Sequence, residues 1–86
     1  MAKDRESEQR MCKLTELEIG QSGTVTSVRS RDSELLRKLL AMGIVAGTTV
    51  QVCNVAPLGD PIEIKARGYN LSLRLSEAFC VEISHS

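Results

Sequence analysis

From Thr48 onward, apolar and polar residues alternate one by one, and this period of two constrains the fold more than any other feature of the sequence. Successive side chains of a strand point to opposite faces, so an alternating run predicts a strand with one apolar and one polar face. Four such runs cover residues 48–53, 62–67, 71–75 and 79–84. Their apolar positions are Val50 and Val52, then Ile62, Ile64 and Ala66, then Leu71, Leu73 and Leu75, and last Phe79, Val81 and Ile83.

The two middle runs predict a β-hairpin. Gly68-Tyr69 lies between them and suits a two-residue turn with glycine first. The cross-strand pairs expected from that turn are Ile62–Leu75, Ile64–Leu73, Ala66–Leu71 and Glu63–Arg74. The three apolar pairs share one face and the charged pair lies on the other, so a single register suits both faces.

A short helix is predicted from Ser33 to Met42. Asp32 or Ser33 can cap its first turn, and Gly43 suits the left-handed residue that follows a helix. Its leucines form a single apolar stripe: Leu35, Leu36, Leu39 and Leu40. This stripe is broad for a small domain, so part of it is expected to stay uncovered.

Residues 23–29, which are rich in Val and Thr, predict a further strand before the helix. Val25 and Val28 stand an odd number of positions apart, which either a β-bulge or burial of the strand on both faces would explain. The chain of 86 residues is therefore expected to be mainly β, with five strands in a small, partly open barrel and the helix at one end. Residues 13–84 would form this domain, and residues 1–12 would form a flexible charged tail.

The charge balance and the rarity of aromatic residues exclude several function classes. Lys and Arg total 11 and Asp and Glu total 11, and Tyr69 and Phe79 are the only aromatic residues of the Phe, Trp and Tyr types. A nucleic-acid-binding protein usually carries a basic excess, so we expect no nucleic-acid partner. No signal peptide and no long apolar run is present, which predicts a cytoplasmic protein without direct membrane insertion.

Neither an active site nor a metal site is predicted. His85 is the only histidine and lies near the end of the chain, so no catalytic residues are assigned and no enzyme is expected. Cys12, Cys53 and Cys80 form no close pair, which argues against a zinc site and against a disulfide framework. Cys53 and Cys80 belong to strands expected to flank the first one, about 10 Å apart. No metal ligands and no cofactor are therefore assigned.

Two segments are candidates for binding a partner. The helix contributes Leu36, Arg37, Leu40 and Met42, and the connection before residue 62 contributes Pro57, Leu58, Gly59 and Asp60. Purely structural interpretations are simpler: the helix residues would form a solvated face, and the loop residues would form a stiff proline-bounded turn. Leu58 is the exception, because an apolar residue at a loop tip has no evident role in the core.

Two stretches resemble the FeoA family, the small cytosolic component of bacterial ferrous iron uptake. One is LLAMGIVAGTTV at residues 39–50, and the other runs from APLGDPI at 56–62, through Arg67-Gly68, to LSLRLSEA at 71–78. The resemblance covers residues 13–84. It implies an SH3-like barrel with an inserted helix, which agrees with the strand count.

The resemblance also implies a function. FeoA-like proteins are expected to interact with a FeoB-type membrane ferrous-iron permease, which carries a cytosolic GTP-binding domain, and to modulate it from the cytosolic side. The alternative is a transition-metal-binding or metal-responsive regulatory module, related to the C-terminal domain of iron-dependent repressors.

Overall fold

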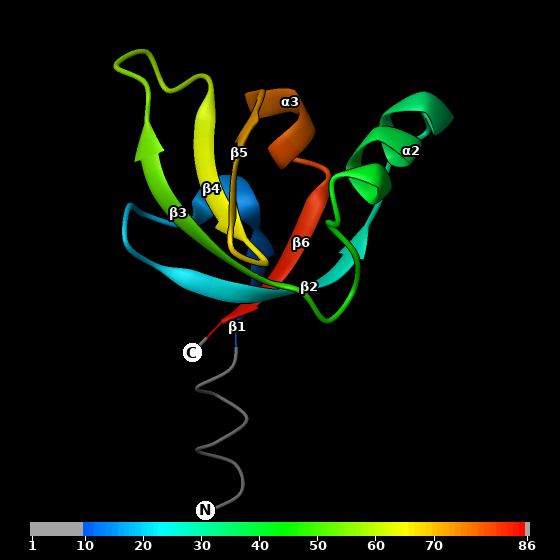
Figure 1. The fold of residues 1–86 in the computed structure, drawn as a ribbon, viewed down its shortest axis with the longest axis horizontal. Helices are drawn as coiled ribbons and strands as arrows, with labels where there is room; N and C mark the ends of the chain where they lie inside the picture. Colours follow the sequence, from blue (N-terminus) through cyan, green and yellow to red (C-terminus); the bar gives the residue numbers. More distant parts are fainter. Residues whose placement is uncertain (1–9, 86) are drawn as a thin grey trace, which may run out of the picture.

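Six strands form one antiparallel sheet in the computed structural model, which describes residues 10–85 (Figure 1). The elements in chain order are β1 (Arg10–Lys13), the 3-10 helix η1 (Leu14–Glu16), β2 (Ser22–Val28), α2 (Ser33–Ala41), β3 (Thr49–Val55), β4 (Ile62–Ala66), β5 (Tyr69–Leu73), α3 (Leu75–Ala78) and β6 (Val81–His85). The mainly β prediction is therefore confirmed, and the helix ends within one residue of its predicted boundary.

The strand order is β1-β6-β2-β3-β4-β5, so β1 and β5 form the two edges of the sheet. The sheet curls around one apolar core but does not close (Figure 1). The expected strand count of five was wrong, because β1 adds a sixth strand. β1 shows no clear alternation of apolar residues, and it forms by pairing its backbone with β6, from Arg10 opposite His85 to Lys13 opposite Glu82. It begins inside the segment that was predicted as tail, and residues 1–9 lie outside the described residues.

Of the two explanations for the positions of Val25 and Val28, the structure confirms the bulge. The pairing of β2 with β6 shifts between Val25 and Ser27, so Val25 and Val28 each reach the core side despite their different parity.

The β4–β5 hairpin corrects the predicted register. The turn lies at Arg67-Gly68, where both residues have positive φ, 55° and 83°, as a type I′ turn requires. Ile62 therefore faces Leu73 instead of Leu75, and Glu63 faces Ser72 instead of Arg74. The remaining pairs are Ile64–Leu71, Lys65–Asn70 and Ala66–Tyr69. Because the shift is two residues, the inward and outward faces stay as predicted.

The chain leaves β5 after Leu73 and forms α3. The sequence had predicted that this strand continues to residue 75 and that the last strand begins at residue 79. Leu75 and Phe79 were predicted to face the core, and they are 44% and 57% exposed. Two carboxylates explain the change. Glu77 Oε1 accepts a hydrogen bond from the Arg74 N–H at 2.9 Å, and Asp60 Oδ1 accepts one from the Leu75 N–H at 2.9 Å. These bonds satisfy amides at the start of a helical turn, so the strand does not continue.

Candidate functional site

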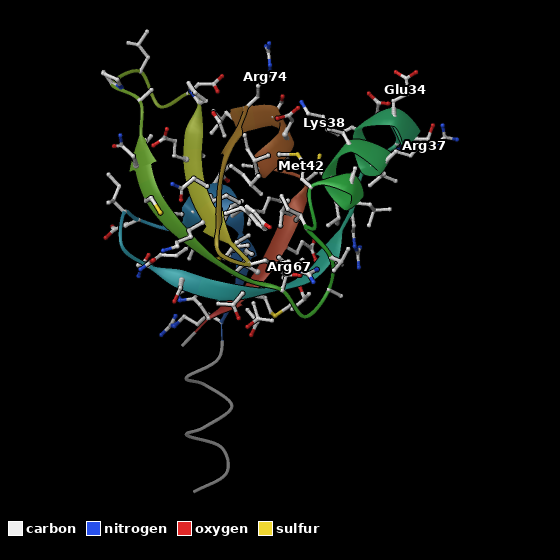
Figure 2. All side chains as sticks on the ribbon, viewed as in Figure 1. Glu34, Arg37, Lys38, Met42, Arg67 and Arg74 are labelled. Carbon is white, nitrogen blue, oxygen red and sulfur yellow. The ribbon has the colours of Figure 1, made fainter. Side chains whose placement is uncertain are left out.

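Some of the predicted partner-binding residues of α2 are half-buried on the side that faces the core, and the others are exposed to solvent. Asp32 caps the helix, since its Oδ1 accepts hydrogen bonds from Glu34 N at 3.0 Å and Leu35 N at 3.3 Å. Leu36 and Met42 are half-buried, and Met42 packs against the core. Arg37 points away from the molecule in Figure 2.

The broad leucine stripe of α2 is only partly covered. Leu39 is fully buried, whereas its neighbour Leu40 is 54% exposed. The prediction of an uncovered apolar remainder on this helix is confirmed at Leu40.

The loop between β3 and β4 is held at its base and exposed at its tip. Ala56 N donates to Pro61 O at 3.0 Å and Gly59 N donates to Ala56 O at 2.7 Å, which closes the loop. Leu58, at the tip, is 95% exposed. Pro57 and Asp60 are also exposed, and Gly59 is half-buried with a φ of 88°. The loop therefore presents one apolar side chain on a short, hydrogen-bonded support.

The two predicted segments do not merge into one patch, because the upper ends of β4 and β5 and helix α3 lie between their tips (Figure 1). They approach each other at one open hollow of about 380 Å³. It is lined by Lys38 of α2, Asp60 and Pro61 of the loop, Ser72 of β5, Arg74, and Glu77 of α3. The structure thus brings Asp60 near α2 and leaves Leu58 and Leu40 on separate surfaces.

An ion pair joins α2 to α3 in this hollow. Lys38 Nζ lies 2.5 Å from Glu77 Oε2, and the Glu77 side chain is 9% exposed. Burial by itself would raise the pKa of Glu77. The hydrogen bonds from Lys38 and the Arg74 backbone, together with the charges of both side chains, outweigh burial and lower its pKa below the ordinary value of 4.5. Glu77 therefore stays ionised and holds the two helices together.

Sequence reasoning missed the surface at α3. Leu75 and Phe79 stand one helical turn apart, and both line a second hollow beside Asp60, Arg74 and Ser76. Lys13 Nζ lies 4.6 Å from the centroid of the Phe79 ring, a cation–π contact. The signal that could have revealed the helix was Glu77, three residues after Arg74 and directly before Ala78.

The cysteines, His85 and the carboxylates do not gather into a metal site. Among residues 10–85, no group of three or more His, Cys, Asp and Glu side chains could hold a metal ion. Cys12, Cys53 and Cys80 are free thiols. Burial, with a smaller effect from the Glu16 carboxylate, raises the pKa of the Cys12 thiol above 9.0. Within the same residues, no helix has the length and apolar character needed to cross a bilayer.

The comparison with protein families shows to which family the chain belongs. The family model of the FeoA domain matches residues 12–85. The chain belongs to the FeoA family. The resemblance seen in residues 39–50 and 56–78 is thereby confirmed over nearly the whole described structure.

Solved FeoA structures share the fold. The FeoA-like protein from Clostridium acetobutylicum is 39% identical with a TM-score of 0.79, over 88% of this chain and 87% of that one. The zinc complex of Stenotrophomonas maltophilia FeoA, a prokaryotic SH3 domain protein, is 29% identical with a TM-score of 0.74, over 84% of this chain and 88% of that one. The SH3-like architecture is therefore shown for this FeoA domain, with an open six-stranded sheet. A manganese-dependent transcriptional repressor has the same fold at 18% identity, with a TM-score of 0.81, over 88% of this chain and 42% of that one.

A relative from Porphyromonas gingivalis joins the two kinds of protein in one chain. It is a fusion of Fe(2+) transport protein A with the Fe(2+) transporter FeoB, and it is 35% identical over 71 residues. Those residues are 83% of this chain and 8% of the fusion protein, so this chain spans only a small part of that relative.

Proposed function

We propose that this FeoA domain is a non-enzymatic accessory protein of ferrous iron uptake that binds a FeoB-type permease at its cytosolic side and modulates it. The observation that carries the proposal is the fusion of an FeoA sequence to FeoB in the P. gingivalis relative. Joining two partners in one chain raises their effective concentration to the millimolar range, which benefits a pair that must meet in order to act.

The surface features of the domain support a binding role. Leu40 and Leu58 are large apolar side chains exposed to 54% and 95%, and both lie on rigid supports, a capped helix and a hydrogen-bonded loop. Covering an exposed apolar side chain with a partner is favourable, because it removes apolar surface from water. We therefore assign partner contacts to two separate surfaces, one formed by Leu36, Arg37, Leu40 and Met42 on α2 and the other by Pro57, Leu58, Gly59 and Asp60 on the loop.

The experiment that tests this proposal measures binding to the full-length FeoB-type permease of the same organism, embedded in lipid nanodiscs. We expect saturable binding with a Kd below about 100 μM, the range of a weak regulatory contact. Leu58→Ala and Leu40→Ala should each weaken binding by about fivefold or more. Ile19→Ala is the matched control, because Ile19 is 59% exposed and lies in neither segment.

Modulation is tested separately, by ferrous-iron uptake into proteoliposomes that contain the permease. Adding this chain should change the uptake rate, and the Leu58→Ala variant should change it less. A wild-type chain that neither binds the permease at about 100 μM nor alters uptake contradicts the proposal.

Transition-metal binding is the second candidate function, and the zinc complex of the S. maltophilia FeoA favours it. Anaerobic calorimetry with ferrous iron and with zinc distinguishes the two candidates. Saturable heat at a stoichiometry near one would support a metal-binding module, whereas permease binding without such heat supports the accessory role.

A further inference from the structure

Helix α3 exposes two apolar side chains beside the 56–61 loop. Leu75 and Phe79 line the second hollow, of about 490 Å³, and Asp60 of the loop lines it with them. Asp60 also ties the loop to the helix, because its Oδ1 accepts a hydrogen bond from the Leu75 N–H at 2.9 Å. We call Leu75 and Phe79 the α3 surface. It adjoins the loop surface, which consists of Pro57, Leu58, Gly59 and Asp60.

Helix α3 separates the α3 surface from α2. Glu77 faces α2, where it pairs with Lys38. On the other side, no α2 residue of the described chain lines the hollow of Leu75 and Phe79. Arg74 stands at the rim of both hollows, and Figure 2 shows its side chain pointing out from the molecule. The loop surface and the α3 surface therefore form one continuous surface, and α2 forms another.

Two carboxylates hold α3 in place before any partner binds. Glu77 Oε1 accepts a hydrogen bond from the Arg74 N–H at 2.9 Å, and Glu77 Oε2 lies 2.5 Å from Lys38 Nζ. Asp60 accepts the next amide, that of Leu75. Because the loop and α2 both fix this short helix, its apolar side chains need little ordering when a partner covers them. The entropic cost of binding is correspondingly low.

The charges beside the α3 surface are balanced. Asp60 and Glu77 offset Arg74 and Lys38, and both carboxylates already accept hydrogen bonds within the domain. A charged group placed in the hollow would lose water without meeting an excess of opposite charge. An apolar side chain would instead remove apolar surface of both partners from water. The charge balance therefore favours an uncharged, apolar occupant.

The far end of the α3 surface is also neutral. Lys13 Nζ lies 4.6 Å from the centroid of the Phe79 ring, and it lies 3.9 Å from Glu82 Oε2. Its charge is thus already offset by a carboxylate. Phe79 stays more than half exposed despite this contact, so most of its apolar surface remains for a partner to cover.

The shape of the hollow favours a side chain of a protein over a small molecule. All five residues that line it are exposed: Asp60, Arg74, Leu75, Ser76 and Phe79. A small-molecule site buries most of its ligand, which such an open hollow does not do. Phenylalanine and arginine are instead enriched at protein interfaces.

We propose that the FeoB-type permease covers the loop surface and the α3 surface as one interface, and that it places a large uncharged apolar side chain between Asp60 and Phe79. The identity of the partner rests on the proposed function. The same partner is assigned to α3 because its surface continues from the loop surface at Asp60. Leu75 and Phe79 form the floor of this contact, and Arg74 forms its polar rim.

The direct test follows the leucine methyl groups of the full chain by NMR while full-length permease in nanodiscs is added. The methyl signals of Leu58 and Leu75 should change together, with the same apparent Kd. A change at Leu58 with none at Leu75 would overturn the inference. A change at Leu75 that grows with the concentration of the free chain would identify a second copy as the occupant, and would overturn it too.

Substitutions on the α3 surface should weaken binding. Leu75→Ala and Phe79→Ala should each weaken it by about fivefold or more, and Phe79→Leu, which keeps an apolar side chain, should recover most of the affinity. Tyr69→Ala is the matched aromatic control, because Tyr69 is 72% exposed and lines neither hollow. An equal loss of affinity in Tyr69→Ala would contradict the assignment of the contact to α3.

Ser76 tests whether the occupant is uncharged. Its side chain is exposed and lines the hollow, so a charge at this position stays hydrated in the free chain. Ser76→Lys and Ser76→Asp should both weaken binding, since each brings a charge against an apolar side chain. Tighter binding of either variant would reveal a charged occupant and overturn the inference. Both variants should fold, so they decide the question even if Phe79→Ala unfolds.

The outcomes distinguish this inference from the proposed function. If the wild-type chain does not bind the permease, both are wrong. If Leu58→Ala weakens binding but the variants of Leu75, Ser76 and Phe79 bind as wild type, the extension to α3 is wrong and the proposed function stands.

Discussion

Gly23 shows how one residue without a side chain lets two strands approach. Its backbone does not need positive φ, but an added Cβ would lie 2.3 Å from Ile83 Cγ2 and 2.9 Å from the carbonyl oxygen of Ser84. Backbone cannot move aside as a flexible side chain can, so Gly23→Ala should destabilise the fold by about 2–3 kcal/mol. Gly20→Ala is the comparison. Gly20 has a φ of 92° with nothing within 4 Å of an added Cβ, so strain alone should cost about 1 kcal/mol.

Urea unfolding of both glycine variants measures this difference. Equal losses of stability would contradict the close approach of β2 to β6 at Gly23.

Glu77 links residue chemistry to acid stability. Its pKa is lower in the folded chain than the ordinary value of 4.5, so ionisation of Glu77 stabilises the fold above that pH. This contribution is lost as the pH falls from 4.5 through the lower folded pKa. Glu77→Gln should therefore lower stability at pH 7 and flatten its decline in that acid range.

Thermal unfolding between pH 3 and 7 tests the prediction on Glu77. Glu63→Gln, at an exposed position of β4, is the matched control and should keep the wild-type pH profile. An unchanged profile for Glu77→Gln would show that the Lys38 pair does not contribute to stability.

At the scale of the element, α2 depends on its cap. The sequence left Asp32 and Ser33 as alternative caps, and Asp32 is the residue that accepts the two amide hydrogen bonds. Asp32→Ala should cost about 1 kcal/mol, whereas Ser33→Ala, one position into the helix, should cost less than about 0.5 kcal/mol. Chemical denaturation of the pair measures both values, and the reverse order would place the cap at Ser33.

At the scale of the whole molecule, the strand order predicts a gradient of local stability. β2 lies between β6 and β3 near the centre of the sheet, while β1 and β5 are its edges. Amides of central strands open only in large unfolding events, whereas edge amides open locally. Hydrogen exchange of the free chain should therefore be slowest at Val25 and Ile83 and much faster at Asn70 and Ser72. Equal protection of β5 and β2 would indicate that the β5 edge is already covered.

The sequence by itself determined which residues of the regular strands β3, β4 and β6 face inward. Alternation specifies the parity of each strand, and the expected inward positions Val50, Val52, Ile64, Val81 and Ile83 are all fully buried. The helix and its left-handed terminal glycine also follow from local patterns, because each depends on neighbours within a few positions. Leu58 was singled out as an apolar loop residue, and its exposure agrees with that reading.

Tertiary structure decided what local patterns do not encode. The alternation of apolar and polar residues fits two hairpin registers that differ by two residues equally well. The turn at Arg67-Gly68, where both residues have positive φ, determines which register forms. Leu75 left the predicted strand because Asp60, 15 residues earlier in the chain, accepts its N–H. β1 forms because its backbone pairs with β6, which lies about 70 residues later in the sequence. The hollow between α2 and α3 and the apolar surface of α3 likewise depend on residues distant in sequence, so only the folded chain reveals them.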